Sequence, residues 1–289
     1  MSNILVTGSN GQLGSEIQQL VSKKVNFFFT DINELDITDE KAIIQFCRKH
    51  SIKTIINCAA YTAVDKAESE FKLADKINNL AVKYLSRVSK EQQIKLIHVS
   101  TDYVFTGTNY RPYIESDKPN PQSVYGSTKL AGERAITEVS PEGAIIIRTS
   151  WVFSSFGNNF VKTMRRLGAE RDSLNVIFDQ VGTPTYAKDL AKAILEIVNA
   201  EKENINPELY HFSNEGVASW YDFAKEIMEI EKLTCQVLPI ETKDYPTPAK
   251  RPHYSLLNKS KIKQEFGIKI PHWKDSLKEC LKEIRHESN

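Results

Sequence analysis

The sequence predicts an α/β fold built on a doubly wound parallel sheet, followed by a smaller C-terminal region. Over the first 150 residues, apolar runs of strand length alternate with helical patterns, and a glycine-punctuated turn from Gly8 to Gly14 directly follows the first run. Strands that alternate with helices in short units form parallel sheets through right-handed crossovers. We therefore expect a Rossmann-like domain whose ligand site lies at the carboxyl ends of the strands.

The expected elements of the first 150 residues follow one another closely. Strands are expected at residues 4–6, 25–30, 54–57, 94–99 and 144–148, and helices at about 12–20, 38–46, 64–91 and 125–139. Thr38 or Asp39 is the expected N-cap of the second helix, because both side chains accept hydrogen bonds from free N–H groups. Residues 106–123 contain three prolines and Gly107, which predicts a loop, and its unusual length makes it a candidate for function.

The strand and helix pattern loosens after about residue 150. Helices are expected at residues 219–231 and 273–284, and short strands at 210–212, 235–238 and 255–257. We expect residues 1–150 to form the dinucleotide-binding domain. Residues 151–289 are expected to be mainly a substrate-binding region, partly interleaved with the last strands of the sheet.

Composition excludes several classes of protein. The net charge of +1, from 38 Lys and Arg against 37 Asp and Glu, gives no basic excess for nucleic acid. No segment has the apolar length of a signal peptide or a membrane helix, and the four cysteines are scattered without a metal-binding spacing. We expect a cytoplasmic protein with reduced cysteines, no membrane or nucleic-acid partner and no metal.

The turn at Gly8, Gly11 and Gly14 has the spacing of a dinucleotide-binding turn. Small residues there permit a tight turn, close approach to a pyrophosphate and close packing of helix on strand. The helix N-terminus then offers free N–H groups to the anion. An ordinary strand-to-helix turn is the alternative interpretation.

Asp31 ends the second expected strand, where an acidic residue accepts hydrogen bonds from an adenosine ribose. No arginine follows Asp31 immediately to bind a 2′-phosphate, so the electrostatics favour NAD(H). Asp36 and Ile37 are expected to border the adenine. The small residues around Ala60 follow the third strand and would let the chain pass close to the nicotinamide half of the cofactor. The alternative interpretation is that Asp31 is an acidic residue in a solvent-exposed loop.

Two Tyr-x-x-x-Lys pairs occur, Tyr125 with Lys129 and Tyr221 with Lys225. Residues i and i+4 share one face of a helix, so the lysine ammonium can lie beside the tyrosine and lower its pKa toward neutrality. The pair alone is weak evidence for a catalytic site, since about one such pair is expected by chance in this chain. Thr101 follows the fourth strand, and Tyr125 begins the helix after the next loop, so these two can meet over one crevice. We assign catalysis to Tyr125, Lys129 and Thr101, and expect Tyr221 to be a packing residue.

Other aromatic and titratable residues fit structural roles better. His98 is expected to be a buried, hydrogen-bonded histidine on the fourth strand, and Trp220 and Trp273 are expected to pack in helices rather than stack on a base.

Seven segments resemble the extended short-chain dehydrogenases and, more narrowly, the dTDP-4-dehydrorhamnose reductase family. The likeness runs in order along nearly the whole chain, in the segments 7–14, 57–68, 100–105, 125–133, 148–153, 157–160 and 245–252. Tyr254 stands where the family usually has an asparagine. Nearly full coverage makes the resemblance more specific than any single motif.

The resemblance implies an NADPH- or NADH-dependent reduction of the 4-keto group of dTDP-4-dehydro-L-rhamnose, giving dTDP-L-rhamnose for cell-surface polysaccharide. Tyr125 would be the general acid, Lys129 would hold the nicotinamide ribose and lower the tyrosine pKa, and Thr101 would bond the carbonyl or the tyrosine. Asp102 and Trp151 would join Thr101 in binding the dTDP-sugar, and a homodimer is possible. The cofactor would be lined by Gly8, Asn10, Gly11, Gln12, Leu13, Gly14, Asp31, Asp36, Ile37, Ala60, Tyr61, Thr62, Val99, Tyr125 and Lys129.

Two alternatives remain open at this point. A reductase or epimerase of another 4-keto-6-deoxy nucleotide sugar would use the same scaffold, and net consumption of NAD(P)H would separate reductase from epimerase. A non-catalytic regulatory subunit would bind the cofactor without oxidising it.

Overall fold

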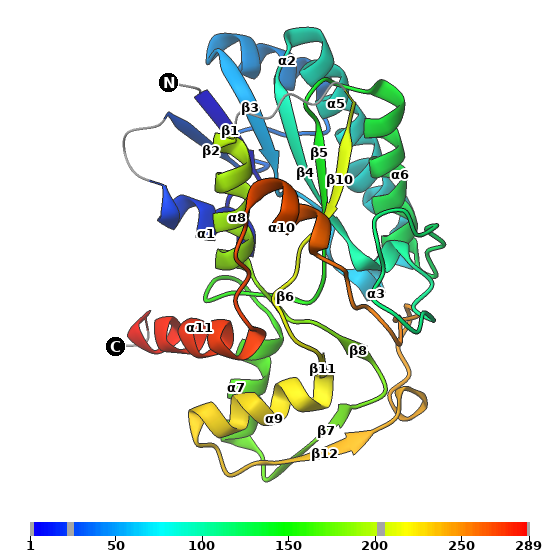
Figure 1. Ribbon diagram of the computed structural model, residues 1–289, viewed down its shortest axis with the longest axis vertical. Coiled ribbons are helices and arrows are strands. Elements are labelled where there is room, and N and C mark those ends of the chain that lie inside the picture. Colours follow the sequence, from blue (N-terminus) through cyan, green and yellow to red (C-terminus); the bar gives the residue numbers. More distant parts are fainter. Residues whose placement is uncertain (1–2, 22–25, 201–205, 288–289) are drawn as a thin grey trace.

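A six-stranded parallel sheet forms the centre of the N-terminal part of the molecule (Figure 1). The computed structural model describes residues 3–21, 26–200 and 206–287. The strand order is β10-β5-β4-β3-β1-β2, and all neighbouring strands are parallel. Their bounds are β1 Asn3–Thr7, β2 Phe27–Thr30, β3 Ile52–Asn57, β4 Lys95–Thr101, β5 Ile145–Thr149 and β10 Glu208–His211.

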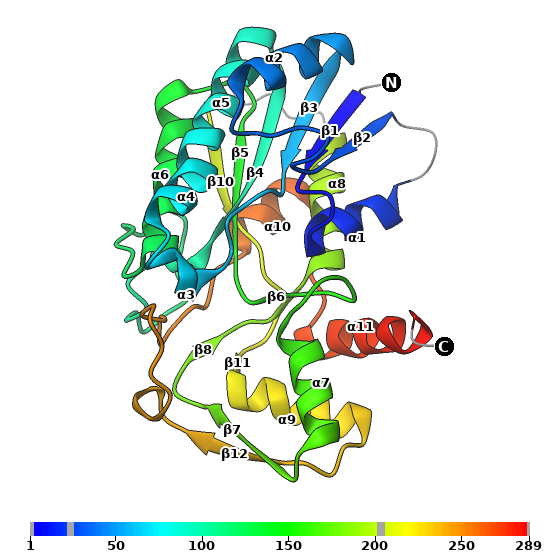
Figure 2. The ribbon, with the colours of Figure 1, turned by 180° about the vertical axis from the view of Figure 1, so that it is seen from behind.

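Helices cover both faces of this sheet, because the strands are apolar on both sides (Figures 1 and 2). Ile4, Ile56 and Ile97 pack beneath α1 Gln12–Leu20 and α8 Ala187–Asn199. Leu5 and its neighbours on the opposite face pack beneath the other layer, formed by α2 Glu40–Lys49, α5 Ala81–Gln92 and α6 Val124–Val139. This alternation follows from the two-residue period of a strand.

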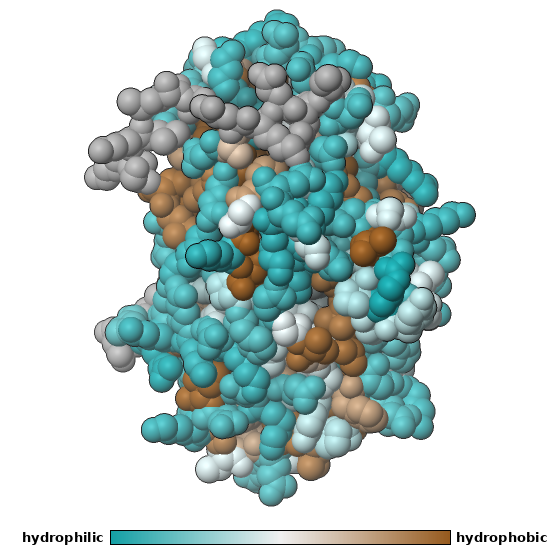
Figure 3. All heavy atoms as spheres, in the orientation of Figure 1, coloured by the Kyte–Doolittle hydropathy of each residue, from teal (hydrophilic) through white to brown (hydrophobic). Residues whose placement is uncertain are grey.

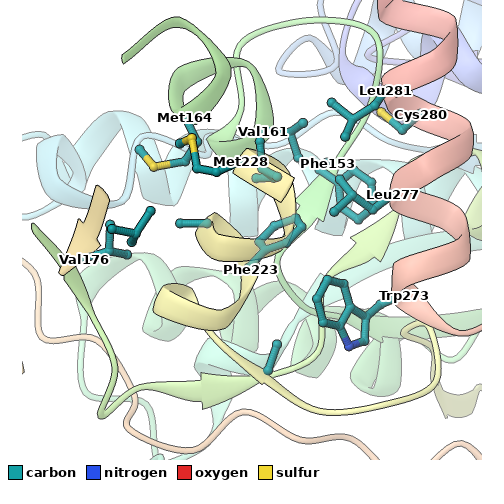
Figure 4. Close-up of a cluster of buried hydrophobic side chains, with 14 of the residues drawn as sticks. Phe153, Val161, Met164, Val176, Phe223, Met228, Trp273, Leu277, Cys280 and Leu281 are labelled. Atoms are coloured by element: carbon teal, nitrogen blue, oxygen red, sulfur yellow. The ribbon is translucent and has the colours of Figure 1, made fainter. Parts of the chain in front are cut away.

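The chain beyond β5 builds a second core of its own (Figure 4). Phe153, Phe223 and Trp273 meet there with aliphatic side chains, and the ring centroids of Phe153 and Phe223 lie 5.4 Å apart. The contributing elements are β6 Val152–Phe153, α7 Phe160–Glu170, β7 Ser173–Ile177, β9 Thr185–Tyr186, β11 Ala218–Ser219, α9 Trp220–Glu231, β12 Gln236–Ile240 and α11 Trp273–Glu287. The short strand β8 Val181–Gly182 pairs with β11.

The outer surface is mostly hydrophilic on the face drawn in Figure 3, with small hydrophobic patches between. The described residues include no helix long and apolar enough to cross a membrane. All four cysteines are free.

Most expected elements are present, and Asp39 is the N-cap of α2 through hydrogen bonds from the N–H groups of Lys41 and Ala42. The expected start of the second strand, Val25, lies outside the described residues. The expected strand at 255–257 is wrong, because this stretch makes only one isolated bridge, from Leu257 to Tyr113.

The prediction of one continuous helix at 64–91 is wrong. The structure divides it into α3 Val64–Ala67, α4 Phe71–Asp75, a π-helical turn Lys76–Leu80 and α5. The elements α7, β7, α8 and α10 Ser260–Phe266 were not expected from the sequence.

The long loop 106–123 packs against a segment near the C-terminus. The N–H of Tyr113 donates to the carbonyl of Leu256 at 2.8 Å, and the N–H of Asn258 donates to the carbonyl of Tyr113 at 2.8 Å. Gly107 has φ +77°, and a Cβ there would lie 2.4 Å from the Cβ of Pro252. The loop therefore fixes the segment 252–258 against the sheet.

Candidate active site

A pocket of about 720 Å³ lies at the carboxyl ends of the sheet strands and is lined by residues from both parts of the chain. This is where ligands bind in open α/β sheets. The sequence-predicted site residues in its lining are Gly8, Gly11, Gln12, Leu13, Gly14, Asp31, Asp36, Ile37, Ala60, Thr62, Val99, Thr101, Asp102, Tyr125, Lys129 and Trp151.

The glycine turn leaves no room for larger residues. Gly8 has φ +66°, and a Cβ there would lie 2.6 Å from the backbone nitrogen of Ala59. A Cβ on Gly14 would lie 2.5 Å from the carbonyl oxygen of Gly8. Gly11, the N-cap of α1, supplies no side chain to the first N–H groups of that helix. These features fit a dinucleotide-binding turn, because the free N–H groups could donate hydrogen bonds to the pyrophosphate.

Asp31 lies at the end of β2 and is held by backbone groups. Its Oδ1 accepts a hydrogen bond from the N–H of Ile32 at 2.8 Å, and its Oδ2 accepts one from the N–H of Asn10 at 3.1 Å. The carboxylate therefore lies in the lining, as a ribose-binding acid must. Asn10 is exposed and is not part of this lining, but its N–H donates to Asp31, and its predicted contact with the cofactor stays a prediction.

Tyr61 is also absent from the lining of this pocket, and its predicted contact with the cofactor stays a prediction. Its hydroxyl donates to Oε2 of Glu70 at 2.5 Å. The backbone of Tyr61 is held by Asn78 in the π-helical turn, which accepts from the N–H at 2.9 Å and donates to the carbonyl at 3.1 Å. The Asn78 amide also donates to Oγ1 of Thr128 at 3.1 Å, which ties this loop to α6. The sequence carries no signal for this role of Asn78, because the π-turn follows from tertiary packing.

Tyr125 and Lys129 lie in the first turns of α6. The N-cap Ser123 accepts a hydrogen bond from the N–H of Gly126 at 3.2 Å, and the N–H of Val124 donates to Oε1 of Glu68 at 2.9 Å. Lys129 is 1% exposed, and its Nζ donates to the Val99 carbonyl at 2.7 Å. The helix start thus holds both side chains over the end of β4.

Burial dominates the ionisation of this pair. It raises the pKa of Tyr125 to about 12, and only the Thr101 hydroxyl opposes that rise. It lowers the pKa of Lys129 to about 8. The Lys129 ammonium donates to the Val99 carbonyl and contacts the His98 ring, and lowering of the Tyr125 pKa by this cation stays a prediction. His98 is fully buried and contacts the Asn57 amide at 2.9 Å, as expected of a structural histidine.

Thr101 and Asp102 form the end of β4. The Thr101 hydroxyl donates to Oδ1 of Asp102 at 3.0 Å and accepts from the N–H of Tyr103 at 3.2 Å. Burial raises the pKa of Asp102 to about 6, although hydrogen bonds with the hydroxyls of Ser255 and Thr101 act to lower it. The Tyr103 ring meets the Tyr125 ring edge to face, with centroids 5.4 Å apart. Thr101 and Tyr125 therefore share one corner of the pocket with an acid.

The second Tyr-x-x-x-Lys pair lies elsewhere. Tyr221 packs against the second core, and Lys225 lies exposed on α9. Neither residue lines the pocket.

The chain matches known proteins along almost its whole length. A family model described as "RmlD substrate binding domain" matches residues 1–286. The dTDP-4-dehydrorhamnose reductase of Aggregatibacter actinomycetemcomitans is 42% identical over 291 residues, covering 96% of this chain and 98% of that protein. The chain belongs to the dTDP-4-dehydrorhamnose reductase family.

Solved structures of the dTDP-4-dehydrorhamnose reductase family share the fold. That from Clostridium acetobutylicum superposes with a TM-score of 0.93 at 43% identity, covering 98% of this chain and 99% of that one. The structure from Bacillus anthracis, in complex with NADP, also superposes with a TM-score of 0.93. It is 36% identical, and the match covers 98% of this chain and 100% of that chain. The Rossmann-like fold class and the family resemblance expected from the sequence are confirmed.

A buried ion pair in this reductase-family chain joins α6 to the sheet, and sequence reasoning missed it. Arg148 donates to Glu133 with Nε at 2.9 Å and Nη2 at 2.6 Å, and Ser100 Oγ donates to the same carboxylate at 2.5 Å. Glu133 lies one helical turn after Lys129. The pair therefore fixes the helix that carries Tyr125. Further pocket residues missed were Ser100, Tyr103, Lys76, Ser150, Val152 and Leu190.

Proposed function

We propose that this protein is an NAD(P)H-dependent oxidoreductase that reduces the 4-keto group of dTDP-4-dehydro-L-rhamnose to give dTDP-L-rhamnose. One observation carries the proposal: a single pocket brings a dinucleotide-type glycine turn together with a buried tyrosine, lysine and threonine. Membership of the dTDP-4-dehydrorhamnose reductase family supports the choice of sugar nucleotide.

The cofactor would be held by the N-terminus of α1, by Asp31 and by Lys129. An ammonium group has three donors, and Lys129 uses one toward the Val99 carbonyl, so it can still donate to a ribose hydroxyl. When bound, the reduced nicotinamide supplies the hydride. Asp31 suits the free ribose hydroxyls of NADH, and a related reductase was solved with NADP, so both forms belong to the proposal.

The protein's own residues would donate the proton that the reduction requires. The pKa of Tyr125, raised to about 12 by burial, keeps its hydroxyl protonated near neutrality. That hydroxyl would donate to the keto oxygen as negative charge develops on it, and Thr101 would supply a further hydrogen bond when its hydroxyl proton turns from Asp102 to that oxygen. Lys129, while protonated, would stabilise the tyrosinate that remains.

We assign substrate binding mainly to residues 151–289, together with Thr101 and Asp102. Trp151, which lines the pocket from this region, supports that assignment. A homodimer in the cytoplasm completes the proposal, and light scattering of the purified protein tests the dimer.

The proposal is tested by measuring NADPH and NADH oxidation with dTDP-4-dehydro-L-rhamnose and a panel of other 4-keto sugar nucleotides. We expect the highest kcat/KM with dTDP-4-dehydro-L-rhamnose and one product per cofactor oxidised. Sugar conversion without net cofactor consumption would indicate an epimerase. Cofactor binding without oxidation by any keto sugar would indicate a regulatory subunit.

A further inference from the structure

We propose that Trp220 is a positioning residue that holds Trp151 as the substrate-facing wall of the pocket. The inference rests on the proposed function, because it assumes that Trp151 contacts the sugar nucleotide. Trp220 itself does not line the pocket. Its effect would pass through the indole of Trp151.

Trp151 occupies an unusual backbone conformation. Its φ is +48°, in the left-handed region that a bulky residue rarely adopts. Two hydrogen bonds from residues 150–151 to residues 183–185 hold this conformation. The N–H of Thr185 donates to the Trp151 carbonyl at 3.1 Å, and Ser150 Oγ donates to the Thr183 carbonyl at 3.0 Å. Such conformations persist where the surroundings over-determine them, and they cluster at functional sites.

The Trp151 indole is stacked on the indole of Trp220. The two ring centroids lie 3.7 Å apart, and the ring planes differ by 10°. This contact joins a pocket residue that follows β5 to the first residue of α9, although the two are far apart in sequence. A parallel stack keeps the pocket indole from tilting or moving toward Trp220.

Trp220 is itself fixed by the second core. Its ring contacts Phe160 with centroids 4.7 Å apart, and it packs against the cluster that contains Phe223. The helix start is held by a capping box, in which Ser219 Oγ accepts from the N–H of Asp222 at 3.0 Å and Asp222 accepts from the N–H of Ser219 at 2.9 Å. The supporting indole is therefore part of a rigid element.

Gly182 confines Trp151 from a second strand. A Cβ on Gly182 would lie 2.8 Å from Cε2 of Trp151. Gly182 is paired with Ala218 in the short antiparallel sheet of β8 and β11, which lie side by side below the main sheet in Figure 1. The same small sheet thus carries Gly182 and leads into Trp220, so both contacts on Trp151 come from one unit.

Trp151 is separated along the sheet from the glycine turn and Asp31. Trp151 follows β5, whereas those cofactor residues follow β1 and β2, at the other end of the strand order. Loosening Trp151 should therefore weaken sugar-nucleotide binding and leave cofactor binding unchanged.

The test is a double-mutant cycle on Trp151→Ala and Trp220→Ala, with Trp220→Phe as the conservative variant and Tyr221→Phe as the control. Calorimetry measures binding of dTDP-L-rhamnose, fluorescence measures binding of NADPH, and circular dichroism measures the exciton signal of the stacked indoles. We expect Trp220→Ala to weaken sugar-nucleotide binding about tenfold, with NADPH binding unchanged and the exciton signal lost. Trp220→Phe should recover most of the binding.

The double variant decides between positioning and general packing. If Trp220 acts through Trp151, Trp151→Ala with Trp220→Ala binds dTDP-L-rhamnose no more weakly than Trp151→Ala alone. Additive losses, or wild-type binding by Trp220→Ala, would overturn the inference. A wild-type protein that binds the sugar nucleotide but never oxidises NADPH with a keto sugar would refute the proposed function alone. Failure of the wild type to bind dTDP-L-rhamnose would overturn both.

Discussion

Tyr125 and Tyr221 have almost the same local setting. Each is the second residue of its helix, each helix is N-capped by a serine, Ser123 or Ser219, and each tyrosine has a lysine four residues later. The tertiary environment separates them, because Tyr125 lines the pocket and Tyr221 packs against the second core. The choice of Tyr125 from the sequence therefore depended on strand order and not on the motif itself.

The first prediction concerns the proton donor. Tyr125→Phe removes the hydroxyl and should lower kcat roughly a hundredfold or more, which is typical of lost general acid catalysis. Tyr221→Phe is the matched control and should keep the wild-type kcat. Steady-state oxidation of NADPH measures both, and the reverse pattern would refute the assignment.

The second prediction concerns Lys129 and pH. Burial lowers the pKa of Lys129 to about 8, so the side chain is cationic below that pH and loses its charge above it. The pH profile of kcat/KM for the cofactor, which reports the free enzyme, should fall on the alkaline side with a midpoint near 8. Lys129→Arg should move this fall to higher pH, and Lys225→Ala should not. A profile that is flat to pH 10 would contradict the assignment.

At the scale of elements, the contact between α6 and the π-helical turn fixes the position of the helix that carries Tyr125 and Lys129. A Cβ on Gly132 of α6 would lie 2.2 Å from the backbone oxygen of Asn78. Asn78 in turn holds both backbone groups of Tyr61 and the Thr128 side chain. The π-turn therefore connects the loop after β3 to the helix of Tyr125 and Lys129.

The third prediction compares two helical glycines. Gly132→Ala should destabilise the protein by about 1–3 kcal/mol and lower kcat, because the methyl group meets backbone that cannot move without shifting α6. Gly168→Ala is the control, since its methyl group would meet the flexible end of Met228, whose sulfur lies 2.4 Å from the Cβ position. Urea unfolding and kcat are measured for both. Equal effects of the two substitutions would contradict this account.

The sequence allowed accurate prediction of the elements whose signals are local. The apolar runs predicted β1, β3, β4 and β5, and the glycine turn and Asp31, which were predicted to hold the cofactor, lie in the lining of the pocket. The π-turn and the two-residue strands β6, β8 and β9 could not be predicted, because they form through pairing partners distant in sequence. The sequence also could not reveal that Tyr61 turns toward Glu70 or that Trp220 stacks on Trp151, because neither contact follows from a local pattern.

At the scale of the whole molecule, polar contacts join the two parts on opposite sides of the pocket. Arg251 makes a bidentate ion pair with Asp65 of α3, at 3.0 and 2.7 Å. Ser154 Oγ donates to Oε1 of Glu16 in α1 at 2.6 Å. Glu16 is fully buried, and burial raises its pKa from 4.5 to about 7.

The fourth prediction follows from that raised pKa. The folded state holds the Glu16 proton between about pH 4.5 and 7, whereas the unfolded chain releases it, so stability is greatest below that range and falls as pH rises through it. The loss from this group is at most about 3 kcal/mol. Glu16→Gln should reduce the fall measured by urea unfolding between pH 5 and 8. An unchanged pH dependence in Glu16→Gln would contradict a buried, protonated Glu16.

The central claim, a reductase that delivers hydride and proton in this pocket, is tested most directly by isotope transfer. The protein is incubated with dTDP-4-dehydro-L-rhamnose and NADPH that carries deuterium at the transferable position, and the product is analysed by mass spectrometry and NMR. We predict dTDP-L-rhamnose with one deuterium at carbon 4, formed roughly a hundredfold more slowly by Tyr125→Phe. A deuterium-free product, or deuterium transfer at the wild-type rate by Tyr125→Phe, would contradict the account.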